Sequence, residues 1–324
     1  MPNKGKNEMV IQSITIIIAY YIDLIVGDPP KWPHPVKLFG RYISFCETHF
    51  NKGRFKGITG LLSLIILIVL IFFITFYLLF YLYHLHFLLG LFVEALLIAT
   101  TISQKGLKQA AMIVYYPLKE KNLPLARKKL SEIVGRDTDE LREKEVVRGT
   151  IETVAENTTD GITAPLFWAF IGGAPFALIY RAINTCDSVV GYKTKELKTF
   201  GKASARLDDF VNWIPARLTG FLMLITKKSP QNSFKKTFNL LRLNAKKHKS
   251  PNSGWNEAAV ALILGVQLGG TNTYQGIVSK APLLGDALRT LEADDIVRTI
   301  TIMQRTTTLF IIGGVLLVLT FTWF

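Results

Sequence analysis

An unbroken apolar run from Gly60 to Tyr83 constrains the fold of this chain more than any other feature. The run reads GLLSLIILIVLIFFITFYLLFYLY and contains no charged residue. As a helix it is long enough to cross about 30 Å of hydrocarbon. With 49% hydrophobic and 19% charged residues, the whole chain is also more apolar than a soluble domain of this length requires. The sequence therefore predicts a membrane-embedded protein.

Five further segments are predicted to enter the membrane, at residues 9–26, 87–102, 163–183, 210–226 and 303–324. The fourth and fifth of the six, 163–183 and 210–226, contain prolines, and 163–183 also contains two adjacent glycines. Such residues break helices inside membranes. If both segments crossed fully, the polar loop 184–207 would lie across the membrane from the other polar regions. We therefore expect these two segments to be shallow, kinked or re-entrant.

The charge of the chain is +14, and much of the excess lies in 105–148 and 227–249. Basic residues collect on the cytoplasmic side of membrane proteins and contact anionic headgroups. We therefore expect two cytoplasmic helical regions, 103–160 and 227–302. No basic stripe with interleaved aromatic residues is present in the sequence, so nucleic acid is not an expected partner.

Neither an internal repeat nor a strong period-two strand is found in the sequence, which predicts an all-α fold: a polytopic membrane protein with soluble helical insertions, forming one catalytic domain over residues 1–324. Asp137 or Thr138 is expected to cap a helix. Residues 255–268 are expected to form one helix that ends at a glycine pair. Cys46 and Cys186 show neither a disulfide framework nor a zinc pattern and are expected to be buried.

Three polar clusters border the predicted membrane segments: 156–160, 184–187 and 206–217. On an α-helix, Glu156 and Asp160 would face the same way. Carboxylate and amide oxygens suit Mg²⁺ that is held jointly with substrate phosphates. A helix end with a turn explains any one cluster equally well, but three clusters at membrane boundaries point to a functional site.

Nine motifs follow one another along the chain. They are GDP at 27–29, WPHPV at 32–36, IVGRDT at 133–138, ETVAEN at 152–157 with DG at 160–161, NTCDSVVGYK at 184–193, SARLDD at 204–209, PARL at 215–218, SPN at 250–252 and GVQLGG at 265–270. In this order, from about residue 23 to about residue 303, the chain resembles the adenosylcobinamide-phosphate synthase family of cobalamin biosynthesis, the CobD/CbiB family. It departs from the family pattern at Thr158-Thr159, where Thr-Val is common, and at Cys186, where Leu is common.

The resemblance implies an integral membrane enzyme of the cell membrane, with several crossings and an active site that faces the cytoplasm. The implied reaction is the ATP-dependent ligation of adenosylcobyric acid with (R)-1-amino-2-propanol or its O-phosphate, through an amide. Mg²⁺ and ATP, the latter as substrate, are implied, and no tightly bound prosthetic group. The expected partners are the corrinoid, the amine, ATP, the lipid bilayer and other late cobalamin-pathway membrane enzymes.

For that reaction, the predicted catalytic residues are Glu156, Asp160, Asp187, Lys193, Asp208 and Asp209. The predicted Mg²⁺ ligands are Glu156, Asp160, Asp187 and Asp208, the first two preferred. The predicted substrate-binding residues are Asp28, His34, Asn157, Asn184, Arg206, Asn212, Arg217, Ser250 and Asn252. Among these, the arginines, together with Lys193, suit phosphate or oxyanion charge. The base that deprotonates the amine is left open between a carboxylate and His34.

Three alternatives remain at this stage. The stiff 32–35 loop suits a lid or corrin-contacting wall, an interfacial tryptophan anchor, or a histidine ligand to cobalt. A non-catalytic scaffold for late corrinoid enzymes would keep working without the carboxylates. A corrinoid transporter should show two related halves, which this sequence lacks.

Overall fold

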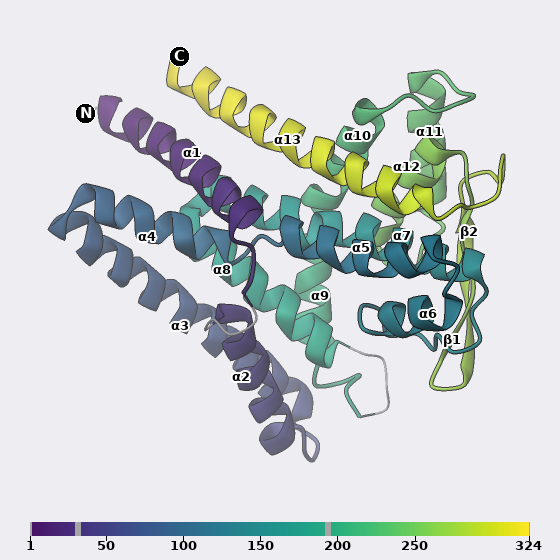
Figure 1. Ribbon diagram of the computed structural model, residues 1–324. Helices are drawn as coiled ribbons and strands as arrows, with labels where there is room; N and C mark the ends of the chain where they lie inside the picture. The colour runs from purple at the N-terminus through teal and green to yellow at the C-terminus, as the bar shows by residue number, and fades with distance from the viewer. Residues whose placement is uncertain (1, 30–33, 192–195, 324) are drawn as a thin grey trace. The chain divides into compact units, whose positions relative to one another are not determined.

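The computed structural model describes residues 2–29, 34–191 and 196–323 (Figure 1). The chain divides into two compact units. The first unit comprises residues 1–103, 160–212 and 311–324, and the second comprises 104–159 and 213–310.

Within the described ranges, five helical stretches are long and apolar enough to cross a membrane: Asn7–Ile25, Lys56–Leu85, Phe87–Lys119, Glu143–Val190 and Asp294–Thr320. The apolar helix α10 (Trp213–Thr226) has 14 residues, or roughly 21 Å, and is too short to cross as a straight helix. These elements define a multi-pass membrane protein and confirm the predicted helical class.

The first unit is built from long helices that enclose one apolar core. Its helices are α1 (Pro2–Ile25), α2 (Pro35–Phe50), α3 (Lys56–Leu85), α4 (Phe87–Ala99), α8 (Ala164–Val190) and α9 (Lys202–Val211). A break at His86 folds α3 and α4 into a helical hairpin, as Figure 1 shows. Leu64, Tyr180, Cys186 and Phe200 are buried together in the core. A Cβ atom at Gly60 of α3 would overlap the Phe200 carbonyl, so glycine allows this close approach.

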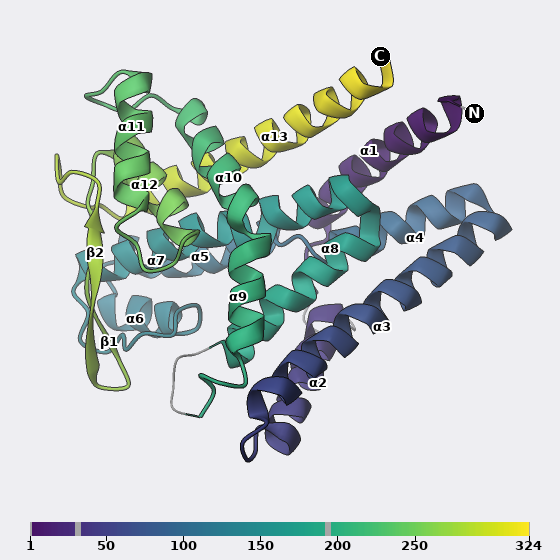
Figure 2. The same ribbon diagram turned by 180° about the vertical axis from the view of Figure 1, so that it is seen from behind.

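Helix α8 is broken in the middle and turns back on itself, as Figure 2 shows. Gly172 has φ −147° and ψ 27°, and Gly173 has φ 63° and ψ −155°, a conformation open almost only to glycine. The Glu94 carboxylate accepts a hydrogen bond from the Ala174 N–H, the first after the break, at 3.3 Å. The kink expected in 163–183 is therefore confirmed, and its re-entrant course in the membrane stays a prediction.

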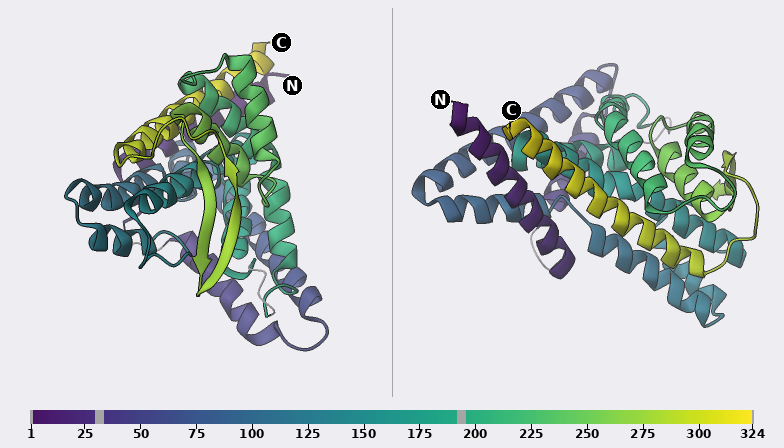
Figure 3. Two further views of the ribbon diagram at one scale, coloured as in Figure 1. Left: turned by 90° about the vertical axis from the view of Figure 1, so that its right-hand side faces the viewer. Right: turned by 90° about the horizontal axis from the view of Figure 1, so that it is seen from above.

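The second unit is arranged around a buried helix, α12 (Ser253–Leu264), which packs against α7, α10 and α11. Every side chain from Ala258 to Leu264 is buried. The surrounding elements are α5 (Gln104–Lys119), α6 (Leu123–Ser131), α7 (Glu143–Thr158), α10, α11 (Phe234–Ala245), a β-hairpin and the first part of α13 (Asp294–Trp323). The hairpin is the long twisted ribbon in Figure 3.

The hairpin corrects the expectation of a chain without strands. Strand β1 (Leu268–Tyr274) pairs with β2 (Ile277–Leu284) in antiparallel register, with Tyr274 opposite Ile277. Both residues between them have positive φ, 51° at Gln275 and 78° at Gly276. This is the two-residue turn whose twist suits a hairpin. The expected helix over 255–268 was also too long, because α12 ends at Leu264 with Gly265 left-handed at φ 67°.

The expected helix cap at Asp137 or Thr138 was wrong. Helix α7 begins at Glu143, and the Glu145 carboxylate accepts a hydrogen bond from the Arg142 N–H at 2.8 Å. The Asp137 carboxylate instead accepts hydrogen bonds from the N–H groups of Gln275 and Gly276, at 3.0 and 2.9 Å. Asp137 therefore fixes the hairpin turn rather than a helix end.

Candidate functional site

The reversal of α8 brings distant parts of the first unit together. The Tyr180 hydroxyl and the Arg181 Nη1 donate hydrogen bonds to the backbone carbonyl of Asp160, at 3.3 and 3.1 Å. Asp160 lies in the single π-helical turn Thr159–Thr163 that precedes α8. Turns of this kind are rare and are frequent at functional sites.

Four predicted residues gather where α8 ends and α9 runs past it: Asn184, Asp187, Asp208 and Asn212. We call them, with Asp160, the α8–α9 cluster. The Asn184 Nδ2 donates to Asp208 Oδ1 at 3.2 Å, and the Asn212 Nδ2 donates to Asp208 Oδ2 at 3.1 Å. Each oxygen of the buried Asp208 carboxylate is thus held by an amide. The Tyr180 hydroxyl also donates to Asn212 Oδ1 at 2.9 Å, which fixes the orientation of that amide.

Burial raises the pKa of Asp208 to about 7, and the nearby charge of Asp187 adds to this shift. The hydrogen bonds from Asn184 and Asn212 act in the opposite direction, because they favour the charged form. A cation between Asp187 and Asp208 would relieve the repulsion that raises this pKa.

The other predicted residues of α9 differ from Asp208 in exposure. Arg206 and Asp209 are exposed, whereas Asp208 is buried on the same helix. Lys193, predicted as catalytic, lies outside the described residues, as do residues 32 and 33 of the proline-rich loop.

His34 caps the start of α2 and pairs with Asp28. Its Nδ1 accepts a hydrogen bond from the Val36 N–H at 3.3 Å, and its Nε2 lies 3.0 Å from Asp28 Oδ1. Because Nδ1 is an acceptor, Nε2 is the nitrogen that carries the proton. Both ring nitrogens are therefore engaged, so a role as base or cobalt ligand would first require one bond to break.

A second group of acidic side chains lies in the second unit, between α7 and α12. We call Glu152, Glu156, Ser253 and Glu257 the α7–α12 cluster. The Ser253 hydroxyl donates to Glu156 Oε1 at 2.7 Å. The predicted Ser250 supports this helix start, since its Oγ accepts from the Ser253 N–H at 3.3 Å.

Glu152 and Glu257 were missed by the sequence reasoning. Glu152 forms an ion pair with Arg136 at 2.7 Å and accepts a hydrogen bond from the Gly269 N–H at 2.8 Å. Burial raises the pKa of Glu257 well above its usual range, and the charges of Glu156 and Glu152 add to this. A carboxylate within an otherwise apolar helix was the available signal for Glu257.

Three more predicted residues of the second unit have local partners. The Asn157 Nδ2 donates to the Thr153 carbonyl of its own helix at 2.9 Å. Asn252 is buried next to the start of α12. The Arg217 guanidinium lies over the Trp213 ring, 4.0 Å from its centroid, and 5.2 Å from that of Trp255.

The α-helical spacing assumed for Glu156 and Asp160 does not hold in the structure. Helix α7 ends at Thr158, and the π-helical turn that contains Asp160 has more residues per turn. The shared cavity for Glu156, Asp160, Asp187 and Asp208 stays a prediction.

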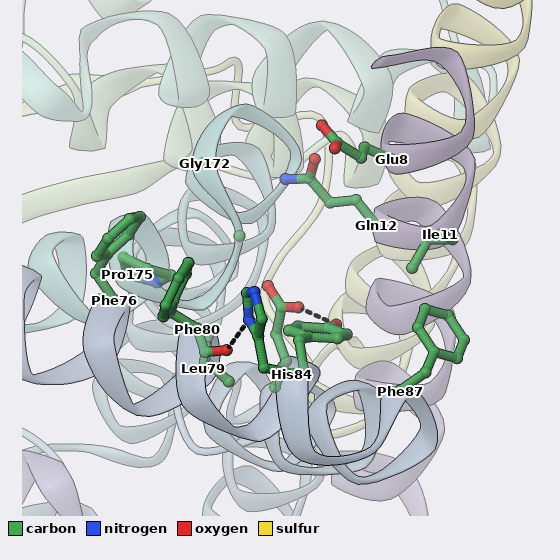
Figure 4. Close-up of a pocket in the computed structure, with 13 residues that line it drawn as sticks. Glu8, Ile11, Gln12, Phe76, Leu79, Phe80, His84, Phe87, Gly172 and Pro175 are labelled. Carbon is green, nitrogen blue, oxygen red and sulfur yellow. Dashed lines mark hydrogen bonds between the residues drawn. The ribbon is translucent and has the colours of Figure 1, made fainter. Parts of the chain in front are cut away.

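A pocket of about 470 Å³ in the first unit contains none of the predicted site residues. In Figure 4, Glu8, Gln12 and His84 point toward a common space between α1 and α3, next to the α8 break. The remaining walls are apolar and aromatic apart from Glu94, and their helices belong to predicted membrane crossings. We therefore separate this pocket from the two polar clusters.

The fold and clusters define a class of multi-pass membrane protein with carboxylates and amides gathered at the ends of apolar helices. The sequence model of the family described as CobD/Cbib protein matches residues 16–303. No solved structure matches the chain. The chain belongs to the CobD/CbiB family, and its role is in cobalamin biosynthesis.

Named relatives support this assignment over nearly their full length. A cobalamin biosynthesis protein CobD of Halalkalibacterium halodurans is 51% identical over 313 residues, which cover 95% of this chain and 98% of the relative. A cobalamin biosynthesis protein CbiB of Salmonella paratyphi B is 42% identical over 296 residues, covering 90% and 93%. A CobD protein of Leptospira interrogans is 40% identical over 285 residues, covering 88% and 90%.

Proposed function

We propose that the protein joins adenosylcobyric acid to (R)-1-amino-2-propanol or its O-phosphate in an ATP-dependent reaction. Membership of the CobD/CbiB family supports the pathway. The observation that carries the chemistry is the α8–α9 cluster, where two amides hold one buried carboxylate. Burying polar groups of this kind beside apolar helices costs free energy unless they pair or bind an ion, so such a cluster supports a functional site.

The reaction needs an activated carboxylate, because a free carboxylate does not accept an amine at neutral pH. We propose transfer of a phosphoryl group from ATP to the corrinoid propionate, which forms an acyl phosphate. The amine nitrogen then bonds to the acyl carbon, phosphate leaves, and the amine loses a proton. A carboxylate of the α8–α9 cluster suits this proton better than His34, whose two ring nitrogens are engaged.

The number of carboxylates in the α8–α9 cluster is enough for Mg²⁺, which usually takes one or two carboxylate ligands from a protein. Among the residues with described positions, no group of three or more His, Cys, Asp or Glu side chains is placed to hold a metal. One or two carboxylates suffice where substrate phosphates complete the shell. Asp187 and Asp208 are the proposed pair of ligands, and the sequence-based assignment of Glu156 and Asp160 to the same ion stays a prediction. When bound, Mg²⁺ would neutralise phosphate charge.

The other proposed roles follow from exposure. Arg206 lies on the open face of α9, where a guanidinium can meet a phosphate. Asn184 and Asn212 hold Asp208 in place, and Ser253 holds Glu156. We place the site on the cytoplasmic side of the cell membrane, because ATP is cytoplasmic and the most basic regions follow the positive-inside rule.

An assay of the purified full chain tests this function. Adenosylcobyric acid, ATP and Mg²⁺ are incubated with the amine or with its O-phosphate, and the corrinoid product is identified by mass. Amide formation that requires ATP is the expected result. If the protein shows a cooperative thermal unfolding transition, and is therefore folded, but forms no amide with either amine, the ligase proposal is wrong. A scaffold role would predict normal cobalamin synthesis in cells when Asp208 is replaced by Asn.

A further inference from the structure

A pocket of about 340 Å³ in the second unit has a strongly basic lining. It lies beside the end of α12, away from the acidic start of that helix. Its charged lining residues are Lys227, Lys228, Arg289 and Arg298, and its uncharged ones are Pro230, Ile263 and Leu264.

The two arginines are held in place by one buried carboxylate. Asp295 is 0% exposed and accepts hydrogen bonds from Arg289 Nη1 and Nη2 at 2.7 and 2.6 Å. It also accepts one from Arg298 Nη1 at 2.7 Å. The Arg289 Nε donates to the Leu264 carbonyl at 3.1 Å, which ties the guanidinium to α12. The arginine positions are therefore set before any ligand arrives.

The lysines complete the positive lining. Lys227 and Lys228 are exposed and follow directly after the last residue of α10. Neither makes an ion pair with any residue whose position is described. Asp295 and Glu292 are the carboxylates paired with the arginines, so the four cations keep an excess of two positive charges.

A simpler role explains only part of this arrangement. Cations near the C-terminal end of a helix are favoured by the helix dipole, which accounts for lysines after α10. It does not account for two arginines that converge on the same pocket from another segment. Arginine forks and lysine ammonium groups together are the usual recognition chemistry for phosphate.

We propose that this pocket binds phosphate groups. Two sources share that chemistry. One is the polyphosphate of a nucleotide, for which the sequence offers no Walker pattern. The other is the headgroup of an anionic phospholipid, since α10 and the Asp294–Thr320 span are apolar segments that end beside the pocket.

The test measures binding to the purified full chain in detergent, without turnover, so its failure would leave the proposed ligase activity standing. The probes are inorganic tripolyphosphate and vesicles of phosphatidylcholine with phosphatidylglycerol. The Lys227→Ala/Lys228→Ala variant removes two exposed lining cations. The matched control, Lys246→Ala/Lys249→Ala, removes two exposed lysines of the same unit that do not line the pocket.

We expect the pocket variant to bind at least one probe about tenfold more weakly, while the control binds as the wild type does. Arg298→Gln should weaken the same probe. Displacement of tripolyphosphate by ATP identifies a nucleotide site, and a selective loss confined to the vesicles identifies a lipid site. If both double variants lose binding equally, or if neither loses it, the pocket is not a phosphate site.

Discussion

The Tyr180 hydroxyl donates a hydrogen bond to the backbone carbonyl of Asp160, 20 residues earlier in the chain, at 3.3 Å. An unbroken helix would separate residues this far apart by about 30 Å. The contact exists because α8 reverses at Gly172-Gly173. The break therefore returns the chain toward Asp160, where Arg181 Nη1 donates hydrogen bonds to the Asp160 carbonyl and to Asn184 Oδ1.

Replacing Gly173 should open this reversal. At φ 63° and ψ −155°, alanine is strained, and its Cβ would overlap the Glu94 carboxylate. We expect Gly173→Ala to lower the free energy of unfolding by about 1–3 kcal/mol and to reduce turnover. Thermal unfolding in detergent measures the first effect, and the ligase assay measures the second.

Gly313→Ala is the control for Gly173→Ala. Gly313 is also in a membrane-spanning helix, α13, but a Cβ there meets nothing within 4 Å. This substitution should leave stability unchanged or raise it by up to about 1 kcal/mol. Equal losses in the two variants would show that the α8 break has no special role.

Asp208→Asn should remove most turnover. The substitution keeps the size of the side chain but removes the charge that Asn184 and Asn212 hold by hydrogen bonds. A loss of about 100-fold or more is expected if the carboxylate carries a proton or a metal ion in the reaction. Asp139→Asn, at an exposed position of the other unit, is the control. Near wild-type turnover in Asp208→Asn would remove Asp208 from the site.

Glu156 of the α7–α12 cluster and Asp160 of the α8–α9 cluster give a graded test. Glu156→Gln and Asp160→Asn should each abolish most turnover at saturating Mg²⁺. Ser253→Ala keeps the Glu156 carboxylate but removes the hydrogen bond that orients it, so a smaller loss of about 10-fold is expected. Full activity in Glu156→Gln would show that this carboxylate is not a ligand.

The sequence predicted the membrane helices and the broken segment because these depend on local properties. Apolar length sets the first, and glycine and proline set the second. The hairpin was missed because β1 contains two glycines and β2 a proline, which weaken a strand pattern, although Gln275-Gly276 was a usable turn signal. The Arg136–Glu152 ion pair joins residues from either side of an unforeseen loop. Contacts of this kind depend on tertiary packing, which no local pattern contains.

Stability should depend on pH through Glu257. Its folded pKa is raised well above its usual range by burial, while an unfolded glutamate ionises with a pKa of about 4.3. Between these two values the folded state keeps a proton that the unfolded state releases. The free energy of unfolding therefore falls as pH rises through this window. Glu257→Gln cannot ionise and should flatten this slope.

Unfolding from about pH 5 to about pH 8 measures the Glu257 effect. EDTA is included so that no divalent cation contributes to the stability of either protein. Wild-type and Glu257→Gln curves that fall in parallel would mean that another group controls the pH dependence.

The position of the α8–α9 cluster relative to the membrane can be measured by cysteine labelling. Ser188 is exposed and follows Asp187 directly. Cys46 and Cys186 are buried free thiols that can be replaced by alanine to give a background without cysteine.

If α8 is re-entrant, Ser188→Cys should react with a membrane-impermeant maleimide only when the reagent can reach the cytoplasmic face. Lys246→Cys and Arg127→Cys, in the basic regions, should behave in the same way. A label that reaches Ser188→Cys from outside intact cells, while Lys246→Cys is protected, would place Asp187 across the membrane from the basic region. That result would reject the shared site, because groups that act on one phosphate must lie within a few ångströms of one another.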